Sequence, residues 1–266
     1  MNKIFDETSV IIENVNVAKD IFLLKISSED IVSYCTPGQF INLKLLEKKF
    51  PFLRRPFSVY DINKNKMYIE ILVKIVGKGT EALSLCRKGD RIKILGPLGK
   101  GFSFSEGSPF ILVAGGIGLP PIYFAYTRIR SLNIDYKFLY GAKTKEEIVS
   151  NKILNIPEKK LTISTDDGSY GIKGTVIDVL KKELGTNSYP ETTKILGCGP
   201  FKMLKEINIL SLKHNIDSEI SLETIMGCGF GVCQGCAIKV KENNLYTYNM
   251  ICKDGPVFNS KKIVWE

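Results

Sequence analysis

The chain has 266 residues, of which 44% are hydrophobic and 24% charged. These proportions are usual for a globular protein and exclude a disordered chain or a fibrous repeat. Its apolar runs, such as residues 110–114, fall far short of the roughly 20 residues of a membrane-spanning helix, so we expect no membrane association. The formal net charge is +9, but the basic residues are spread along the chain, so we expect no nucleic-acid partner.

The N-terminus carries Asp6 and Glu7 where a signal peptide would have its apolar region. We therefore expect a cytoplasmic protein. In a reducing compartment the seven cysteines are expected to be metal ligands or buried thiols rather than disulfides.

Residues 1–102 predict an antiparallel β-barrel, because short alternating strands are separated by turn residues. The breaks are Pro37-Gly38, 63–65 and 88–90, and one possible helix covers 81–87. The expected strands are 9–17, 21–26, 40–45, 57–60, 67–76 and 91–95.

Residues 103–216 predict a parallel α/β domain, because apolar strands alternate with glycine turns and helical stretches such as 201–212. Residues 217–266 lack a clear apolar period and predict a small third module that its cysteines hold together. The fold class is thus multi-domain, β plus α/β. The expected strands of the second domain are 110–114, 137–140, 161–164 and 195–197.

Four cysteines of the last module have the spacing C-x4-C-x2-C followed by a distant fourth. This is the ligand spacing of a plant-type [2Fe-2S] cluster. Glycines between the ligands allow the loop to turn its N–H groups toward the sulfur atoms. An intervening hairpin is expected before the fourth ligand. The predicted ligands are Cys228, Cys233, Cys236 and Cys252.

Two other interpretations compete with a cluster. A four-cysteine zinc site usually uses two separate short knuckles, and a Cys233–Cys236 redox disulfide leaves Cys228 and Cys252 without a role. A zinc-stabilised interaction protein would be colourless, so an absorption spectrum separates it from a flavin and iron–sulfur protein. Cys35 and Cys86 are expected to be buried thiols.

Three short motifs of the barrel predict contacts with a phosphate or a flavin. Arg54-Arg55-Pro56-Phe57-Ser58 enters a strand, and an arginine fork suits a phosphate. Leu72-Val73-Lys74 ends a strand before Gly77-Lys78-Gly79-Thr80, a turn that exposes N–H groups at a helix start. Taken singly, Arg55 is equally compatible with a surface salt bridge and Thr80 with a helix cap.

Two glycine turns follow strands of the second domain. Gly115, Gly116 and Gly118 precede two prolines that fit the first turn of a helix, although the sequence is not G-x-G-x-x-G. Cys198 and Gly199 form the second turn. Both turns allow a nicotinamide dinucleotide to approach the backbone, and Cys198 is expected beside the nicotinamide; a purely structural turn is the alternative.

With R-P-x-S, G-x-G-T, G-G-I-G-x-P-P and G-C-G-P in this order, the chain resembles the ferredoxin-NADP reductase superfamily. The cysteine motif and Cys252-Lys253-Asp254-Gly255-Pro256-Val257-Phe258 extend the resemblance to the electron-transfer subunits of the NAD-linked dihydroorotate dehydrogenases, type B. It covers nearly the whole chain. Phe57 stands where an aliphatic residue is often found. The resemblance implies FAD contacts for Arg55, Pro56, Phe57, Ser58, Leu72, Val73, Lys74, Gly79 and Thr80.

The resemblance also implies an oxidoreductase subunit of pyrimidine biosynthesis with FAD, a [2Fe-2S] cluster and NAD(H). Its expected partner is an FMN-containing dihydroorotate dehydrogenase catalytic subunit, in a heterotetramer with two copies of each chain. The protein itself shows no nucleophile and base pair, so the cofactors are expected to carry the chemistry. The alternative function is the small subunit of an NAD(P)H-dependent ferredoxin oxidoreductase or a sulfide dehydrogenase.

Overall fold

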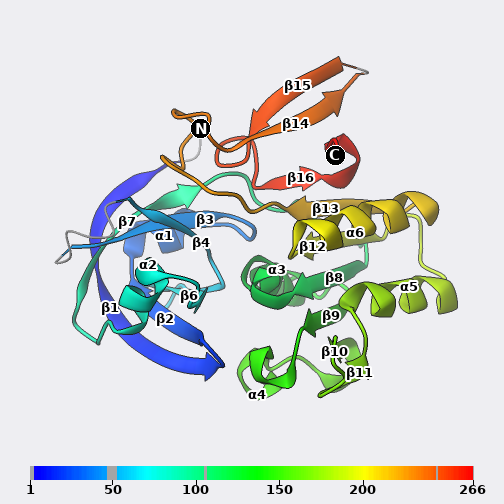
Figure 1. The fold of residues 1–266 in the computed structure, drawn as a ribbon, viewed down its shortest axis with the longest axis horizontal. Coiled ribbons are helices and arrows are strands. Elements are labelled where there is room, and N and C mark those ends of the chain that lie inside the picture. The colour runs from blue at the N-terminus through cyan, green and yellow to red at the C-terminus, as the bar shows by residue number, and fades with distance from the viewer. Residues whose placement is uncertain (1–2, 47–52, 105–106, 244, 266) are drawn as a thin grey trace.

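The computed structural model describes residues 3–46, 53–104, 107–243 and 245–265. Two seven-stranded sheets lie side by side, and a two-stranded hairpin projects from one end of the molecule (Figure 1). The segment between the second sheet and the hairpin crosses to the barrel, where Asn42 is hydrogen-bonded to the Cys228 carbonyl. The N-terminal barrel, the α/β sheet and the cysteine segment are thus in mutual contact.

The first sheet is an antiparallel barrel with strand order β4-β3-β7-β1-β2-β6-β5. Its alternating apolar residues, such as Leu24, Ile41 and Ile94, are completely buried inside it. The strands are β1 (Phe5–Ala18), β2 (Ile21–Ser27), β3 (Phe40–Leu45), β4 (Arg55–Ser58), β5 (Asp61–Asn63), β6 (Tyr68–Lys74) and β7 (Arg91–Leu98), with helices α1 (Glu29–Tyr34) and α2 (Lys78–Ser84).

All six barrel strands expected from the sequence are confirmed, with end points that differ by a few residues. The short strand β5 and helix α1 were missed. Helix α2 begins at Lys78, three residues before the expected start. The Thr80 hydroxyl accepts hydrogen bonds from the N–H groups of Val76 and Gly77, at 2.9 and 3.2 Å, and so fixes the helix start there.

The second sheet has the order β11-β10-β9-β8-β12-β13-β16 and is parallel except for β16. Its α-helices are α3 (Leu119–Ser131), α4 (Asn151–Leu154), α5 (Val176–Thr186) and α6 (Phe201–Lys213), and its short 3-10 turns are η1 (Gly116–Gly118), η2 (Lys145–Glu147), η3 (Glu158–Lys160) and η4 (Ser260–Lys262). Its strands are β8 (Phe110–Gly115), β9 (Tyr136–Ala142), β10 (Leu161–Thr165), β11 (Ile172–Lys173), β12 (Lys194–Cys198), β13 (Asp217–Ser221) and β16 (Val257–Asn259).

The central strand β8 explains the continuous apolar sequence of this domain. Leu112 and Ala114 pack with α3 on one face of the sheet, whereas Ile111 and Val113 pack with α5 and α6 on the other. A strand covered on both faces has no polar side to alternate with. The four expected strands and the helix with prolines in its first turn are confirmed.

The hairpin expected before the fourth cysteine is also confirmed, as β14 (Ala237–Glu242) and β15 (Leu245–Met250). The 217–266 segment additionally contributes β13 and β16 to the α/β sheet, because Ile220 and Phe258 are buried beside Leu204 and Ile207 of α6. The proposed division at 216/217 therefore runs through a continuous sheet. Within the described ranges, no helix is both long and apolar enough to span a bilayer.

Candidate functional site

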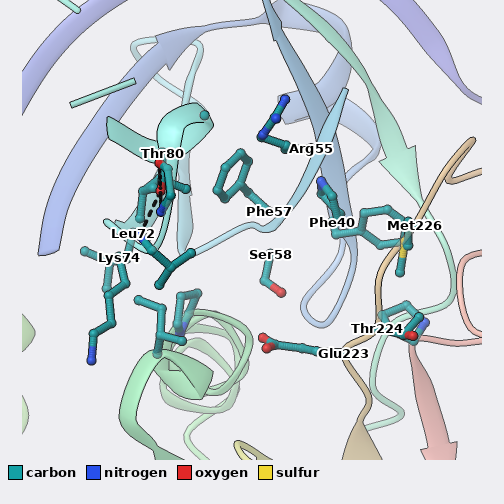
Figure 2. A pocket seen from close by; sticks show the side chains of 18 of the residues that line it. Phe40, Arg55, Phe57, Ser58, Leu72, Lys74, Thr80, Glu223, Thr224 and Met226 are labelled. Carbon is teal, nitrogen blue, oxygen red and sulfur yellow. Dashed lines mark hydrogen bonds between the residues drawn. The ribbon is translucent and has the colours of Figure 1, made fainter. Parts of the chain in front are cut away.

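A cavity of about 460 Å³ lies where the barrel meets the α/β sheet (Figure 2). One wall comes from β4, β6 and the start of α2, which are far apart in the sequence. These elements bring together all nine residues expected to contact FAD, and each lines the cavity: Arg55, Pro56, Phe57, Ser58, Leu72, Val73, Lys74, Gly79 and Thr80.

Of the two neighbouring arginines, only Arg55 lines the cavity. Its side chain covers Gly79, where an added Cβ would lie 2.0 Å from Nε, and Nη1 donates to the Leu53 carbonyl at 2.7 Å. Arg54 instead pairs with Asp6, with Nη2 2.8 Å from Oδ1. Arg55 therefore supplies a guanidinium to this wall of the cavity, and Gly79 leaves the space that the side chain needs.

The facing wall was missed by the sequence analysis. It comes from the segment after β13 and includes Leu222, Glu223, Thr224 and Met226. The Glu223 carboxylate points toward the Ser58 hydroxyl across the cavity (Figure 2). Burial by the surrounding protein raises the pKa of Glu223. An isolated glutamate just before the cysteine motif was the only signal for this wall.

A second cavity, of about 690 Å³, lies at the carboxyl ends of the parallel strands. Such ends are where nucleotides bind in open α/β sheets. Gly115, Gly116, Gly118 and Gly199 line this cavity as expected. It also shares four lining residues with the first cavity, so the two adjoin: Lys74, Ile117, Leu222 and Glu223.

Cys198 differs from the other residues expected at the second cavity. It is 0% exposed, packs with the core on the α3 side of the sheet, and lines neither cavity. Burial, followed by the nearby Glu223 charge, raises the pKa of its thiol. The Cys198 carbonyl lies against the turn that contains Gly118, since an added Cβ on Gly118 would lie 2.4 Å from the Cys198 oxygen. The two glycine turns are therefore close together.

The four predicted ligands lie in one region as two pairs. The Cys236 and Cys252 sulfur atoms are 3.2 Å apart. In the other pair, the Cys233 N–H donates to the Cys228 sulfur at 3.4 Å. Burial acts to raise the pKa of Cys228, but this bond and further backbone N–H groups lower it to about 6. The loop therefore favours the thiolate that a metal needs.

Burial and the neighbouring Cys236 raise the pKa of Cys252 to about 12. A bound cation at the Cys252 sulfur would favour its thiolate. Among the residues with described positions, no three His, Cys, Asp or Glu side chains converge on one point as a mononuclear site requires. The close Cys236 and Cys252 sulfur atoms, with Cys228 and Cys233 as neighbours in the loop, instead match a binuclear cluster, which takes two protein ligands on each iron.

The other two cysteines lie in the barrel. Cys35 is buried, as expected. Cys86 is only partly buried, because it follows the C-terminus of α2, with its sulfur 3.5 Å from the Ala82 carbonyl oxygen.

Two parts of the chain match known protein families. Residues 8–102 match the family described as oxidoreductase FAD-binding domain, and residues 223–264 match the iron–sulfur cluster binding domain of dihydroorotate dehydrogenase B. The chain is 35% identical over 267 residues to the "Dihydroorotate dehydrogenase B (NAD(+)), electron transfer subunit" of Desulforamulus reducens, and the match covers 100% of both chains. The Clostridium acetobutylicum protein of the same name is 38% identical, over 95% of this chain and 94% of its own.

The chain belongs to the family of dihydroorotate dehydrogenase B electron transfer subunits. A solved NADH-dependent reduced ferredoxin-NADP oxidoreductase superposes with a TM-score of 0.83 at 28% identity, over 97% of this chain and 90% of that chain. A Neisseria gonorrhoeae ferredoxin NADP+ reductase with bound FAD and NADP has a TM-score of 0.68 at 20% identity, covering 82% and 99%, and shows the shared fold. This electron transfer subunit is thus an oxidoreductase component with the expected barrel, parallel sheet and cluster-binding segment.

Proposed function

We propose that this subunit carries electrons between NAD(H) and the catalytic subunit of a dihydroorotate dehydrogenase, in pyrimidine biosynthesis. The observation that carries the proposal is that the first cavity adjoins both other sites. It shares four lining residues with the second cavity, and its lining residue Met226 is two residues from Cys228. When bound, FAD accepts electron pairs as hydride and a [2Fe-2S] cluster passes single electrons.

The chain's own residues bind and orient these groups. Arg55 and the Gly77–Thr80 turn provide a cation and N–H groups for the FAD phosphates, and Phe57, Ser58 and Leu72–Lys74 provide the surface for the flavin. Cys228, Cys233, Cys236 and Cys252 hold the cluster. These assignments are supported by the one cavity that all nine expected FAD contacts line and by the contacts among the four cysteines.

NAD(H) is proposed to bind the second cavity. Gly115, Gly116, Gly118 and Gly199 allow its nicotinamide end to reach the first cavity, and the basic lining residues attract its phosphates. Of these, Lys74 and Lys181 already pair with Glu147 and Glu206. Lys143 and Lys202 are therefore the proposed phosphate contacts. Because Cys198 is enclosed in the core, its proposed role is to shape the turn with its backbone.

The proposed partner is an FMN-containing catalytic subunit, assembled as two copies of each chain in the cytoplasm. An electron carrier beside the molecular surface needs a protein partner to receive its electrons. Large apolar side chains are exposed beside the cysteine loop, where Ile225 is 91% and Val232 72% exposed. Leu245 and Tyr248 add exposed apolar surface on the hairpin. Exposed apolar side chains of this size support a protein interface at this end of the molecule.

The test is to express the chain alone and together with the catalytic subunit. We expect the chain alone to reduce artificial dyes with NADH, and only the pair to reduce NAD with dihydroorotate. An Ile225→Asp, Val232→Asp double variant should lose assembly and the coupled reaction but keep the dye reaction. Ile153→Asp on the distant α4 is the control. Dihydroorotate oxidation by the chain alone would overturn the proposal.

A second candidate is the small subunit of an NADH-dependent ferredoxin-NADP oxidoreductase, which the 0.83 TM-score favours. The match of residues 223–264 to the cluster binding domain of dihydroorotate dehydrogenase B weighs against this candidate. Assembly with a ferredoxin-reducing subunit, with no coupled reaction from dihydroorotate, would select this candidate instead.

A further inference from the structure

Asn42 is a buried polar side chain that reaches from the barrel to the cysteine loop. It lies on β3 and is 1% exposed. Its Nδ2 donates to the carbonyl oxygen of Cys228 at 3.1 Å, across 186 positions of sequence. Its Oδ1 is buried without a hydrogen-bond partner in the described structure. A buried unpaired oxygen lowers stability, so barrel packing alone gives no reason for an amide at this position.

Strand β3 connects Asn42 rigidly to the first cavity. In the antiparallel ladder, Asn42 lies opposite Pro56 and Phe40 lies opposite Ser58. Phe40, Pro56 and Ser58 all line the cavity. The pairing of β3 with β4 therefore fixes Asn42 relative to the cavity wall, while its side chain holds the backbone of a predicted cluster ligand.

Gly229 shows that the loop is shaped to this amide. It has φ +82°, in the left-handed region, and an added Cβ would lie 2.0 Å from Asn42 Nδ2. The loop approaches the amide so closely that any side chain at this position would displace one of the two. Gly229 thus serves both the turn of the loop and its contact with β3.

We propose that Asn42 is a positioning residue that locks the Cys228 end of the cysteine loop to the flavin-lining strands. This hydrogen bond holds the cluster-binding loop at one distance and orientation relative to the first cavity. This inference rests on the proposed function only in that the loop binds the cluster and the cavity binds FAD. Without the amide, the loop keeps its ligands but samples several positions, so electrons cross from the flavin more slowly.

The first test replaces Asn42 with leucine, which has a similar size but cannot donate to the Cys228 carbonyl. FAD content and the rate of flavin reduction by NADH should be unchanged. The rate of cluster reduction by the reduced flavin, followed by rapid mixing with NADH, should fall about tenfold. Losing one hydrogen bond lowers the population of the held loop position by about that factor. The electron paramagnetic resonance lines of the reduced cluster should broaden.

Asn14 offers a matched control on the same barrel. Its Nδ2 donates to carbonyl oxygens at the end of α2, including Cys86 at 2.8 Å and Ser84 at 3.0 Å. Asn14→Leu should leave both the transfer rate and the resonance lines of the cluster unchanged. If Asn42→Leu matches the wild type in these two measurements, the positioning role is wrong.

A double-mutant cycle tests the contact without any turnover. Gly229→Ala should speed cluster release to an iron chelator, and this effect should be smaller in an Asn42→Ala background, where the amide no longer meets the new methyl group. Purely additive effects would overturn the proposal. A wild-type chain that binds no iron and sulfide would instead refute the proposed function, so the two failures are distinguishable.

Discussion

The ring of Tyr60 stacks on the ring of Tyr123 across the boundary between the barrel and the α/β sheet. The ring centroids are 4.2 Å apart and the planes differ by 7°. Tyr60 follows β4 and Tyr123 belongs to α3, and both rings are buried. The Tyr123 hydroxyl donates to the Leu154 carbonyl at 3.0 Å. This stack helps to hold the barrel and the α/β sheet, which line the two adjoining cavities, in a fixed position relative to each other.

Replacing Tyr123 with alanine should therefore loosen the packing between the barrel and the α/β sheet. We expect the free energy of unfolding to fall by about 3–5 kcal/mol, as for other buried aromatic residues, and hydride transfer from NADH to the flavin to slow. Denaturant unfolding and stopped-flow absorbance measure the two effects. Tyr123→Phe keeps the ring and should lose only the hydroxyl contact. Equal losses in both variants would mean that the stacked ring contributes nothing.

A pH dependence is expected at Asp61, on β5 beside this stack. Burial raises the pKa of Asp61, against the opposing effect of hydrogen bonds from the Ile62 N–H and the Thr127 hydroxyl. The folded protein therefore holds this proton more tightly than the unfolded chain does. The resulting stability is present below the ordinary aspartate pKa, about 3.9, and is lost as pH rises through the raised folded value.

The measurement is the melting temperature against pH for the wild type and Asp61→Asn. The variant should lack the fall that begins above pH of about 4. Asp178→Asn should change the profile in the opposite sense, because the Thr175 hydroxyl and N–H lower the pKa of Asp178 and its stabilisation is lost as pH falls. Parallel profiles for the wild type and Asp61→Asn would show that Asp61 keeps an ordinary pKa.

Arg55→Ala should weaken FAD retention. The change removes a cation from the wall of the first cavity, and the lost charge-assisted contact is expected to cost about 1.5–3 kcal/mol. Gel filtration at increasing dilution, with the flavin absorbance of the protein peak, measures it. Arg54→Ala is the matched control, because Arg54 pairs with Asp6 and does not line the cavity. Full FAD occupancy after repeated dilution would remove Arg55 from the binding set.

Cys233→Ser should abolish the visible absorption of the [2Fe-2S] centre and destabilise the cysteine segment, because metal binding contributes to the folding of a segment with little core of its own. Iron and sulfide analysis together with limited proteolysis measures both effects. Cys86→Ser in the barrel should change neither. Wild-type iron and sulfide content in the Cys233 variant would show that another residue is the ligand.

Local features of the sequence predicted much of this protein. The apolar periods of the strands, the prolines at the start of α3 and the C-x4-C-x2-C spacing each act within a few residues, so most elements were predictable and the four cysteines could be predicted as ligands. The nine FAD-contact predictions came from the order of short motifs and the family resemblance, and the barrel brings all nine to one cavity.

The tertiary structure alone decided which distant residues meet. No local pattern predicts that Glu223 faces Ser58, that Asn42 reaches the Cys228 carbonyl, or that Cys198 is enclosed in the core while Gly199 beside it lines a cavity. Strands β13 and β16 join the α/β sheet because apolar faces far apart in the sequence bury each other. Such contacts depend on how complete sheets and helices pack, which a short stretch of sequence does not encode.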